Sequence, residues 1–191
     1  MKTILEKEIN LIKDKSKRDA TRDCIAIREN ELRDYPASIS GRYHPPEERG
    51  PGGLLLHIAR MCRVAEDLTQ HLALTDEEHD LLIVSCILHD ISNIDLSERD
   101  GYGRIIRDHK KYSEFHGELS YVIASKYFIN YGFEHDSDFM LQLNGIMSSH
   151  MGYWLPNSKK PTRKMELILS ILDYIDTREY VHIDLPGVRY V

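Results

Sequence analysis

An unbroken apolar run, residues 81–88, leads directly into the adjacent pair His89-Asp90, and it constrains the fold more than any other feature. The run follows Thr75, which with Glu78 three residues later has the pattern of a helix-capping box. An imidazole beside a carboxylate is a poor way merely to end a buried helix. The two groups together are suited to a divalent metal ion, which takes both oxygen and nitrogen ligands.

Most of the remaining chain has helical periodicity as well. Amphipathic or apolar helical patterns cover residues 2–15, 17–32, 54–72, 113–131, 137–150 and 163–180. No segment alternates over a length sufficient for a sheet, so we predict an all-α fold. Thr162 is predicted to cap the last helix, and the Pro- and Gly-rich residues 35–53 are predicted to form a loop.

The length of 191 residues favours a single domain with a sizeable core. We predict that residues 1–31 form N-terminal helices packed on this core, that residues 32–180 form the main domain, and that residues 181–191 form a C-terminal tail.

Composition and charge exclude several function classes. The net charge of −6 argues against a long basic groove for duplex nucleic acid but is compatible with a small phosphorylated substrate. The N-terminus is charged and resembles no signal peptide, and no apolar stretch is long enough to span a membrane. The three cysteines are far apart and form neither a disulfide framework nor a metal knuckle. We therefore expect a cytoplasmic protein with no membrane partner.

Histidine and aspartate residues recur at the ends or on the apolar faces of several predicted helices. They are His57, His89, Asp90, His116, His150 and Asp173. A single histidine on an apolar helix is more often a core residue than a ligand. Positions on five separate elements favour a shared metal site, since an aspartate is rarely buried without a partner.

The order His, His-Asp, His, His, Asp resembles that of the HD-domain metal-dependent phosphohydrolases. Within that family the chain is most similar to the subgroup of the YhaM-type 3′–5′ exoribonucleases. The similar segments are residues 35–37, 43–44, 52–57, 88–91, 149–152, 159–161 and 171–178. The resemblance implies a single helical domain with a central metal site.

The resemblance also implies a set of ligands and a reaction. His57, His89, Asp90 and Asp173 would bind one ion, and Asp90 would be the catalytic carboxylate that can bridge two ions. His116 and His150 would complete a second metal site or bind the substrate phosphate. One or two divalent ions are expected, with Mn²⁺, Fe²⁺, Ni²⁺ or Zn²⁺ favoured over Mg²⁺ because so many ligands are imidazoles.

The expected reaction is cleavage of a phosphodiester in a nucleotide, short oligonucleotide or cyclic nucleotide by metal-bound hydroxide. One alternative is a nucleoside monophosphate phosphatase. Another is a non-catalytic regulatory or binding module stabilised by its metal, because Asn93 stands where the family often has lysine. The expected partner is a small, nucleotide-like phosphorylated substrate, and short single-stranded nucleic acid would also be compatible.

Outside the ligand set, three residues are candidate substrate contacts: Lys160 and Arg163 for phosphate, and Trp154 for a nucleobase. His44 and His109 are weaker candidates for a substrate contact. Other charged residues have simpler interpretations: Glu47 and Glu48 as surface charges, and Arg178 as an ion-pair partner of Asp176.

Overall fold

The computed structural model describes residues 3–38, 43–101, 105–107 and 109–178, apart from the side chains of residues 99, 107 and 109–114. The predicted tail, residues 181–191, lies outside the described part. The α-helices within it are α1 (Glu6–Ile9), α2 (Lys15–Arg33), α3 (Gly53–Leu72), α4 (Asp76–Leu88), α5 (His109–Asn130), α6 (Asp138–Ser149) and α7 (Lys164–Asp176). Short 3₁₀ turns span Pro46–Glu48, Ile91–Asn93 and Gly152–Trp154. The all-α prediction is confirmed.

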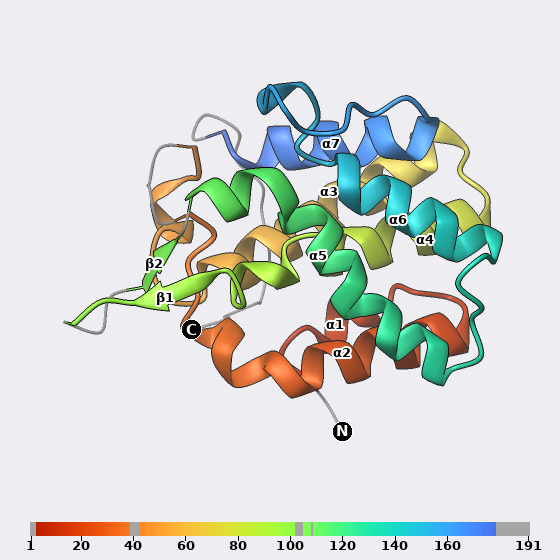
Figure 1. Cartoon of the computed structure of the whole chain (residues 1–191). Helices are drawn as coiled ribbons and strands as arrows, with labels where there is room; N and C mark the ends of the chain where they lie inside the picture. Colours follow the sequence, from red (N-terminus) through yellow and green to blue (C-terminus); the bar gives the residue numbers. More distant parts are fainter. Residues whose placement is uncertain (1–2, 39–42, 102–104, 108, 179–191) are drawn as a thin grey trace.

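Helix α4 lies at the centre of the bundle, with α3, α6 and α7 on one side and α1 and α2 on another (Figure 1). The predicted capping box is present: Thr75 accepts a hydrogen bond from the Glu78 backbone N–H, and the Glu78 side chain accepts one from Thr75 N–H. Every residue from 79 to 88 is buried. The end of this helix therefore places His89 and Asp90 in the interior of the protein.

The predicted first helix over residues 2–15 is wrong, because the helix spans only Glu6–Ile9. The carboxylate of Asp80, on α4, accepts hydrogen bonds from the backbone N–H groups of Lys13 (2.7 Å) and Asp14 (2.8 Å). Asp14 then caps α2 through Lys17 N–H at 2.8 Å. These hydrogen bonds occupy the backbone N–H groups of Lys13 and Asp14, so these residues do not continue the first helix. The apolar residues of this segment nevertheless belong to the central core.

Several boundaries also differ from the sequence prediction, and the last helix ends at Asp176 rather than at residue 180. Helix α5 begins at residue 109 rather than 113, and a two-stranded antiparallel hairpin, β1 (Ser97–Arg99) and β2 (Ile105–Arg107), replaces part of an expected loop. Strands of three residues are too short to reveal a period of two. Helix α7 is capped at Arg163 instead of Thr162, because Glu166 accepts hydrogen bonds from the backbone N–H of both.

No helix of the described chain is long and apolar enough to cross a bilayer.

Helices α5 and α6 approach closely at Gly117. A Cβ atom at this position would lie 2.1 Å from the backbone oxygen of Met147, which is the oxygen that accepts the hydrogen bond of His150 Nδ1. The absence of a side chain at Gly117 therefore lets α5 pack against the end of α6 beside a candidate ligand.

We expect Gly117→Ala to lower the free energy of unfolding by about 1–3 kcal/mol, because the added methyl group must push the two helices apart. Urea denaturation measures the effect. Gly50→Ala is the matched control, since a Cβ there meets nothing within 4 Å. Equal stability of the two variants would contradict the close approach of α5 and α6.

Candidate metal centre

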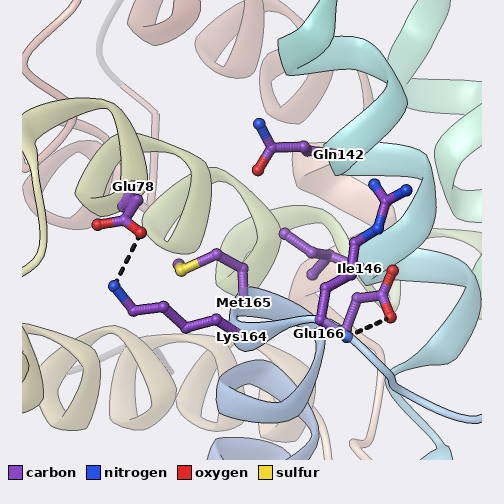
Figure 2. A pocket seen from close by; sticks show the side chains of 7 residues that line it. Glu78, Gln142, Ile146, Lys164, Met165 and Glu166 are labelled. Carbon is purple, nitrogen blue, oxygen red and sulfur yellow. Dashed lines mark hydrogen bonds and ion pairs between the residues drawn. The ribbon is translucent and has the colours of Figure 1, made fainter.

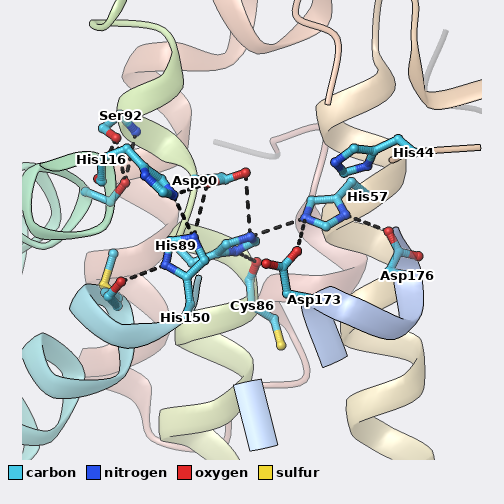
Figure 3. A network of polar contacts seen from close by, with 12 residues as sticks. His44, His57, Cys86, His89, Asp90, Ser92, His116, His150, Asp173 and Asp176 are labelled. Carbon is cyan, nitrogen blue, oxygen red and sulfur yellow. Dashed lines mark hydrogen bonds and ion pairs between the residues drawn. The ribbon is translucent and has the colours of Figure 1, made fainter. Parts of the chain in front are cut away.

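The six predicted ligands come together in the interior of the bundle (Figure 3). His57 lies in the second turn of α3, His89 and Asp90 follow α4, His116 lies in α5, His150 follows α6 and Asp173 lies in α7. All six are buried. The five elements thus present imidazoles and carboxylates to a common space.

The first group of ligand atoms belongs to His57, His89 and Asp90, which lie within 4.8 Å of one another, with Asp173 close to His57. His57 Nε2 lies 3.2 Å from His89 Nε2 and 3.5 Å from Asp173 Oδ1. His89 Nε2 lies 3.7 Å from Asp90 Oδ2. Ligand atoms about 2.0–2.2 Å from a shared ion are separated by about 3–3.5 Å, so these spacings fit a divalent ion.

The second group contains the other oxygen of Asp90. Asp90 Oδ1 lies 3.5 Å from His116 Nε2 and 3.6 Å from His150 Nε2, and the two nitrogens are 2.8 Å apart. Within the described part of the chain, this buried oxygen has no hydrogen-bond partner. Oδ2 of Asp90 therefore faces the first group, and Oδ1 faces the second.

The protonation pattern of the imidazoles also favours a cation. His89 Nδ1 faces the Cys86 carbonyl oxygen at 3.1 Å, and His57 Nδ1 faces Asp176 Oδ2 at 2.6 Å. Since these oxygens can only accept, each Nδ1 carries a proton, and in the neutral ring the Nε2 lone pair is free. Two lone pairs 3.2 Å apart repel unless a positive charge lies between them. The donor set therefore fits a metal ion.

Burial and charge displace the pKa values of these groups in opposite directions. Burial alone would lower the pKa of His57, but Asp176 and Asp173 raise it to about 10. Burial lowers the pKa of His89 to about 3 despite the neighbouring Asp90. Burial raises the pKa of Asp173 to about 6. In the absence of a metal ion, the raised pKa of His57 keeps this ring protonated. The proton supplies the positive charge between His57 Nε2 and His89 Nε2.

Metal uptake should consequently release protons. At pH 7 the ion-free His57, with a pKa of about 10, is protonated and must lose a proton before Nε2 can bind the ion. The metal affinity should rise by about tenfold per pH unit for each proton released. Calorimetry in buffers of different ionisation enthalpy measures this release. A metal affinity that stays constant between pH 6 and pH 8 would contradict it.

A buried network behind His57 was not found by sequence reasoning. Asp176 accepts the His57 hydrogen bond through Oδ2, and its Oδ1 lies 2.8 Å from Arg60 Nε. Arg60 Nη1 also lies 3.2 Å from Glu48 Oε1, and Glu48 Oε2 lies 2.8 Å from His44 Nδ1. The network fixes the ring orientation of His57, as carboxylates commonly do for metal-binding histidines.

Two sequence interpretations are corrected here. Glu48 is fully buried rather than a surface charge, because the loop that carries it folds back to pack its backbone against Gly53. Asp176 pairs with His57 and Arg60 rather than with Arg178. Its position three residues after Asp173, on the same helix face, was the one signal that could have identified it. No sequence signal marked Glu48.

We expect Asp176→Asn to weaken metal binding by about 10- to 100-fold, because His57 loses the carboxylate that orients it. Competition with a chelator measures the dissociation constant. Asp67→Asn is the control, since Asp67 is half-exposed and forms an ion pair within α3. A dissociation constant equal to that of the control would show that Asp176 does not support the metal site.

The predicted substrate contacts lie in three different settings. Lys160 Nζ donates hydrogen bonds to the backbone oxygens of Gly152 and Leu155, at 3.1 and 2.7 Å. Arg163 lines a separate surface pocket with Glu78, Gln142, Ile146, Lys164, Met165 and Glu166 (Figure 2). None of the candidate metal ligands lines that pocket. Trp154 is half-exposed and stacks on Tyr174. The substrate roles of these residues stay predictions.

Comparison with known families gives one match. The description "HD domain" matches residues 54–178, which is more than half of the chain and includes all six candidate ligands. Neither the curated proteins nor the solved structures gave a significant match.

Proposed function

The chain belongs to the HD-domain family of metal-dependent phosphohydrolases, and we propose that it cleaves a phosphodiester in a nucleotide, short oligonucleotide or cyclic nucleotide. One observation carries the proposal. The two oxygens of Asp90 face two neighbouring groups of imidazoles, an arrangement that would suit two ions sharing a carboxylate.

Each part of the centre has a distinct task. His57, His89 and Asp173 would hold one ion with Asp90, and His116 and His150 would hold the other. Divalent ions bound there supply Lewis acidity and an activated water. The side chains of His57 and His89 are fully buried, whereas that of Asp173 is 13% exposed. Substrate would therefore approach from the side of Asp173.

Asn93 supports a catalytic role over a purely structural one. It is fully buried, and neither its amide nitrogen nor its amide oxygen has a hydrogen-bond partner among the residues that the structure describes. Residues three apart in a 3₁₀ turn lie on the same side, so Asn93 shares a side with Asp90. An unpartnered buried amide is costly for stability, and its N–H donors would suit a bound phosphate group.

The preference for a diester rests on the sequence similarity to the YhaM-type exoribonucleases. Paired metal ions serve both phosphatases and nucleases, so the geometry also supports the runner-up, a nucleoside monophosphate phosphatase.

A substrate panel tests the proposal. Protein loaded with Mn²⁺, Ni²⁺ or Zn²⁺ is incubated with a dinucleotide, a cyclic nucleotide, bis(p-nitrophenyl) phosphate and a 5′-mononucleotide. We expect hydrolysis of the diesters. Release of phosphate from the mononucleotide alone would favour the phosphatase. No hydrolysis across the panel, with an Asp90→Ala variant that only loses thermal stability, would favour a regulatory module.

A further inference from the structure

Three side chains from the segment after α6 and from the end of α7 form what we call the aromatic stack: Trp154, Tyr174 and Arg178. The rings of Trp154 and Tyr174 are nearly parallel, with centroids 4.0 Å apart and 17° between planes. Arg178 Cζ lies 3.8 Å from the Tyr174 ring centroid. Trp154 and Arg178 cannot both contact the same face of the Tyr174 ring at these distances. The Tyr174 ring therefore lies between the Trp154 ring and the Arg178 guanidinium.

In the sequence, two residues of the aromatic stack are close neighbours of candidate metal ligands. Tyr174 directly follows the candidate ligand Asp173, and consecutive Cα atoms are about 3.8 Å apart. Trp154 follows the candidate ligand His150 by four residues, at the end of the 3₁₀ turn Gly152–Trp154 that lies over α7 (Figure 1). Asp173 is also the most exposed of the six candidate ligands. The aromatic stack therefore lies within one helical turn of a candidate ligand on α7, on the neighbouring side of the helix.

The segment that carries Trp154 is held in place before any ligand arrives. Lys160 Nζ and Ser158 Oγ both donate hydrogen bonds to the Gly152 backbone oxygen, at 3.1 and 2.8 Å. Gly152 has a φ of +51°, and a Cβ there would lie 2.5 Å from Ser170 Oγ on α7. The turn thus packs closely against α7, which reduces the entropy lost when a ligand stacks on Trp154.

The aromatic stack has unused binding capacity. Trp154 is 51% exposed, and Tyr174 is its ring partner within the part of the chain that the structure describes. One face of the indole is therefore open. Arg178 Nε is buried without a hydrogen-bond partner, and no carboxylate among the described residues pairs with Arg178. The open face of Trp154, at the opposite end of the aromatic stack from Arg178, suits a flat aromatic ring.

We propose that the aromatic stack is a nucleobase platform, on which the substrate base stacks against the open face of Trp154 while its phosphate lies at Asp90 and Asp173. This inference rests on the proposed function and deepens it by naming the surface that would hold the base of the nucleotide. Base stacking on an aromatic side chain tolerates any base, so the platform selects for a base without reading its identity.

Fluorescence gives a direct test, because Trp154 is the only tryptophan of the chain. The Zn²⁺-loaded wild-type protein is titrated with the non-hydrolysable methylene phosphonate analogue of AMP, and separately with the corresponding ribose phosphonate that lacks the base. We expect saturable quenching with the first compound and none at equal occupancy with the second. Absence of quenching by the base-bearing analogue, with binding verified by calorimetry, would overturn the proposal.

Kinetics of Trp154→Leu give a second readout. We expect the KM for a dinucleotide to rise by roughly 5- to 150-fold, while kcat/KM for the abasic counterpart stays unchanged. Trp154→Phe should restore part of the affinity. Tyr153→Leu is the matched control, since Tyr153 is the adjacent exposed aromatic residue outside the aromatic stack. Equal KM values for Trp154→Leu and the control would also overturn the proposal.

The two proposals fail in different ways. Quenching by the base-bearing analogue in a protein that hydrolyses no phosphoester would uphold the platform and contradict the hydrolase. Hydrolysis that is indifferent to the base and to Trp154 would uphold the hydrolase and contradict the platform.

Discussion

Replacing Asp90 with asparagine is expected to reduce phosphoester hydrolysis by roughly a thousandfold or more. Each oxygen of Asp90 faces one of the two groups of imidazoles, so the substitution replaces one of these oxygens with an NH₂ group and removes the negative charge next to both groups. Loss of the Lewis acid costs several kcal/mol of transition-state stabilisation, and each 1.36 kcal/mol corresponds to a factor of ten in rate. The volume of the side chain hardly changes, so the effect is on charge and ligation rather than on packing.

Asp95→Asn is the control for this variant. Asp95 lies shortly after Asp90 but forms an ion pair with Arg28 on α2 at 2.6 Å, away from the imidazoles. It should retain wild-type turnover and metal content. If Asp90→Asn also retains wild-type kcat and wild-type metal content, Asp90 neither bridges the ions nor supports the reaction.

Removal of the metal ions is expected to lower the melting temperature by about 8–16 °C. Four carboxylates of the centre, Glu48, Asp90, Asp173 and Asp176, are buried, and Arg60 is the one buried guanidinium beside them among the described residues. An ion present at a thousandfold excess over its dissociation constant stabilises the folded state by about 4.1 kcal/mol. For a chain of this size, each kcal/mol shifts the melting temperature by about 2–4 °C.

Differential scanning calorimetry before and after chelation measures this shift, and added Zn²⁺ should reverse it. In Asp90→Asn the same chelation should have a much smaller effect, because fewer ions remain to be removed. A melting temperature that is unchanged by chelation in the wild type, although metal analysis shows that the ion has left, would contradict a structural contribution from the ions.

The fold was largely predictable because its main determinants are local. The capping box at Thr75 and the fully apolar run after it identified α4, and strong periodicity identified α3 and α6. The first helix was mispredicted because a distant side chain, Asp80, captures the backbone N–H groups of Lys13 and Asp14. A tertiary contact of that kind leaves no periodic signal in the sequence.

The same distinction applies to the site. The six candidate ligands could be predicted because they stand at helix ends or on apolar faces, where an isolated imidazole or carboxylate is conspicuous. Glu48 lies in an irregular loop whose path depends on the close approach of Gly53, so its burial could not be predicted. The stacking of Trp154 on Tyr174 likewise depends on how the segment after α6 folds over α7.

The metal content of the purified protein tests the central claim most directly. Elemental analysis after loading with Mn²⁺, Ni²⁺ or Zn²⁺ and removal of free ions should give two divalent ions per chain, and fewer in Asp90→Asn. A purified protein that is free of metal, stays folded and takes up none of these ions would contradict the account.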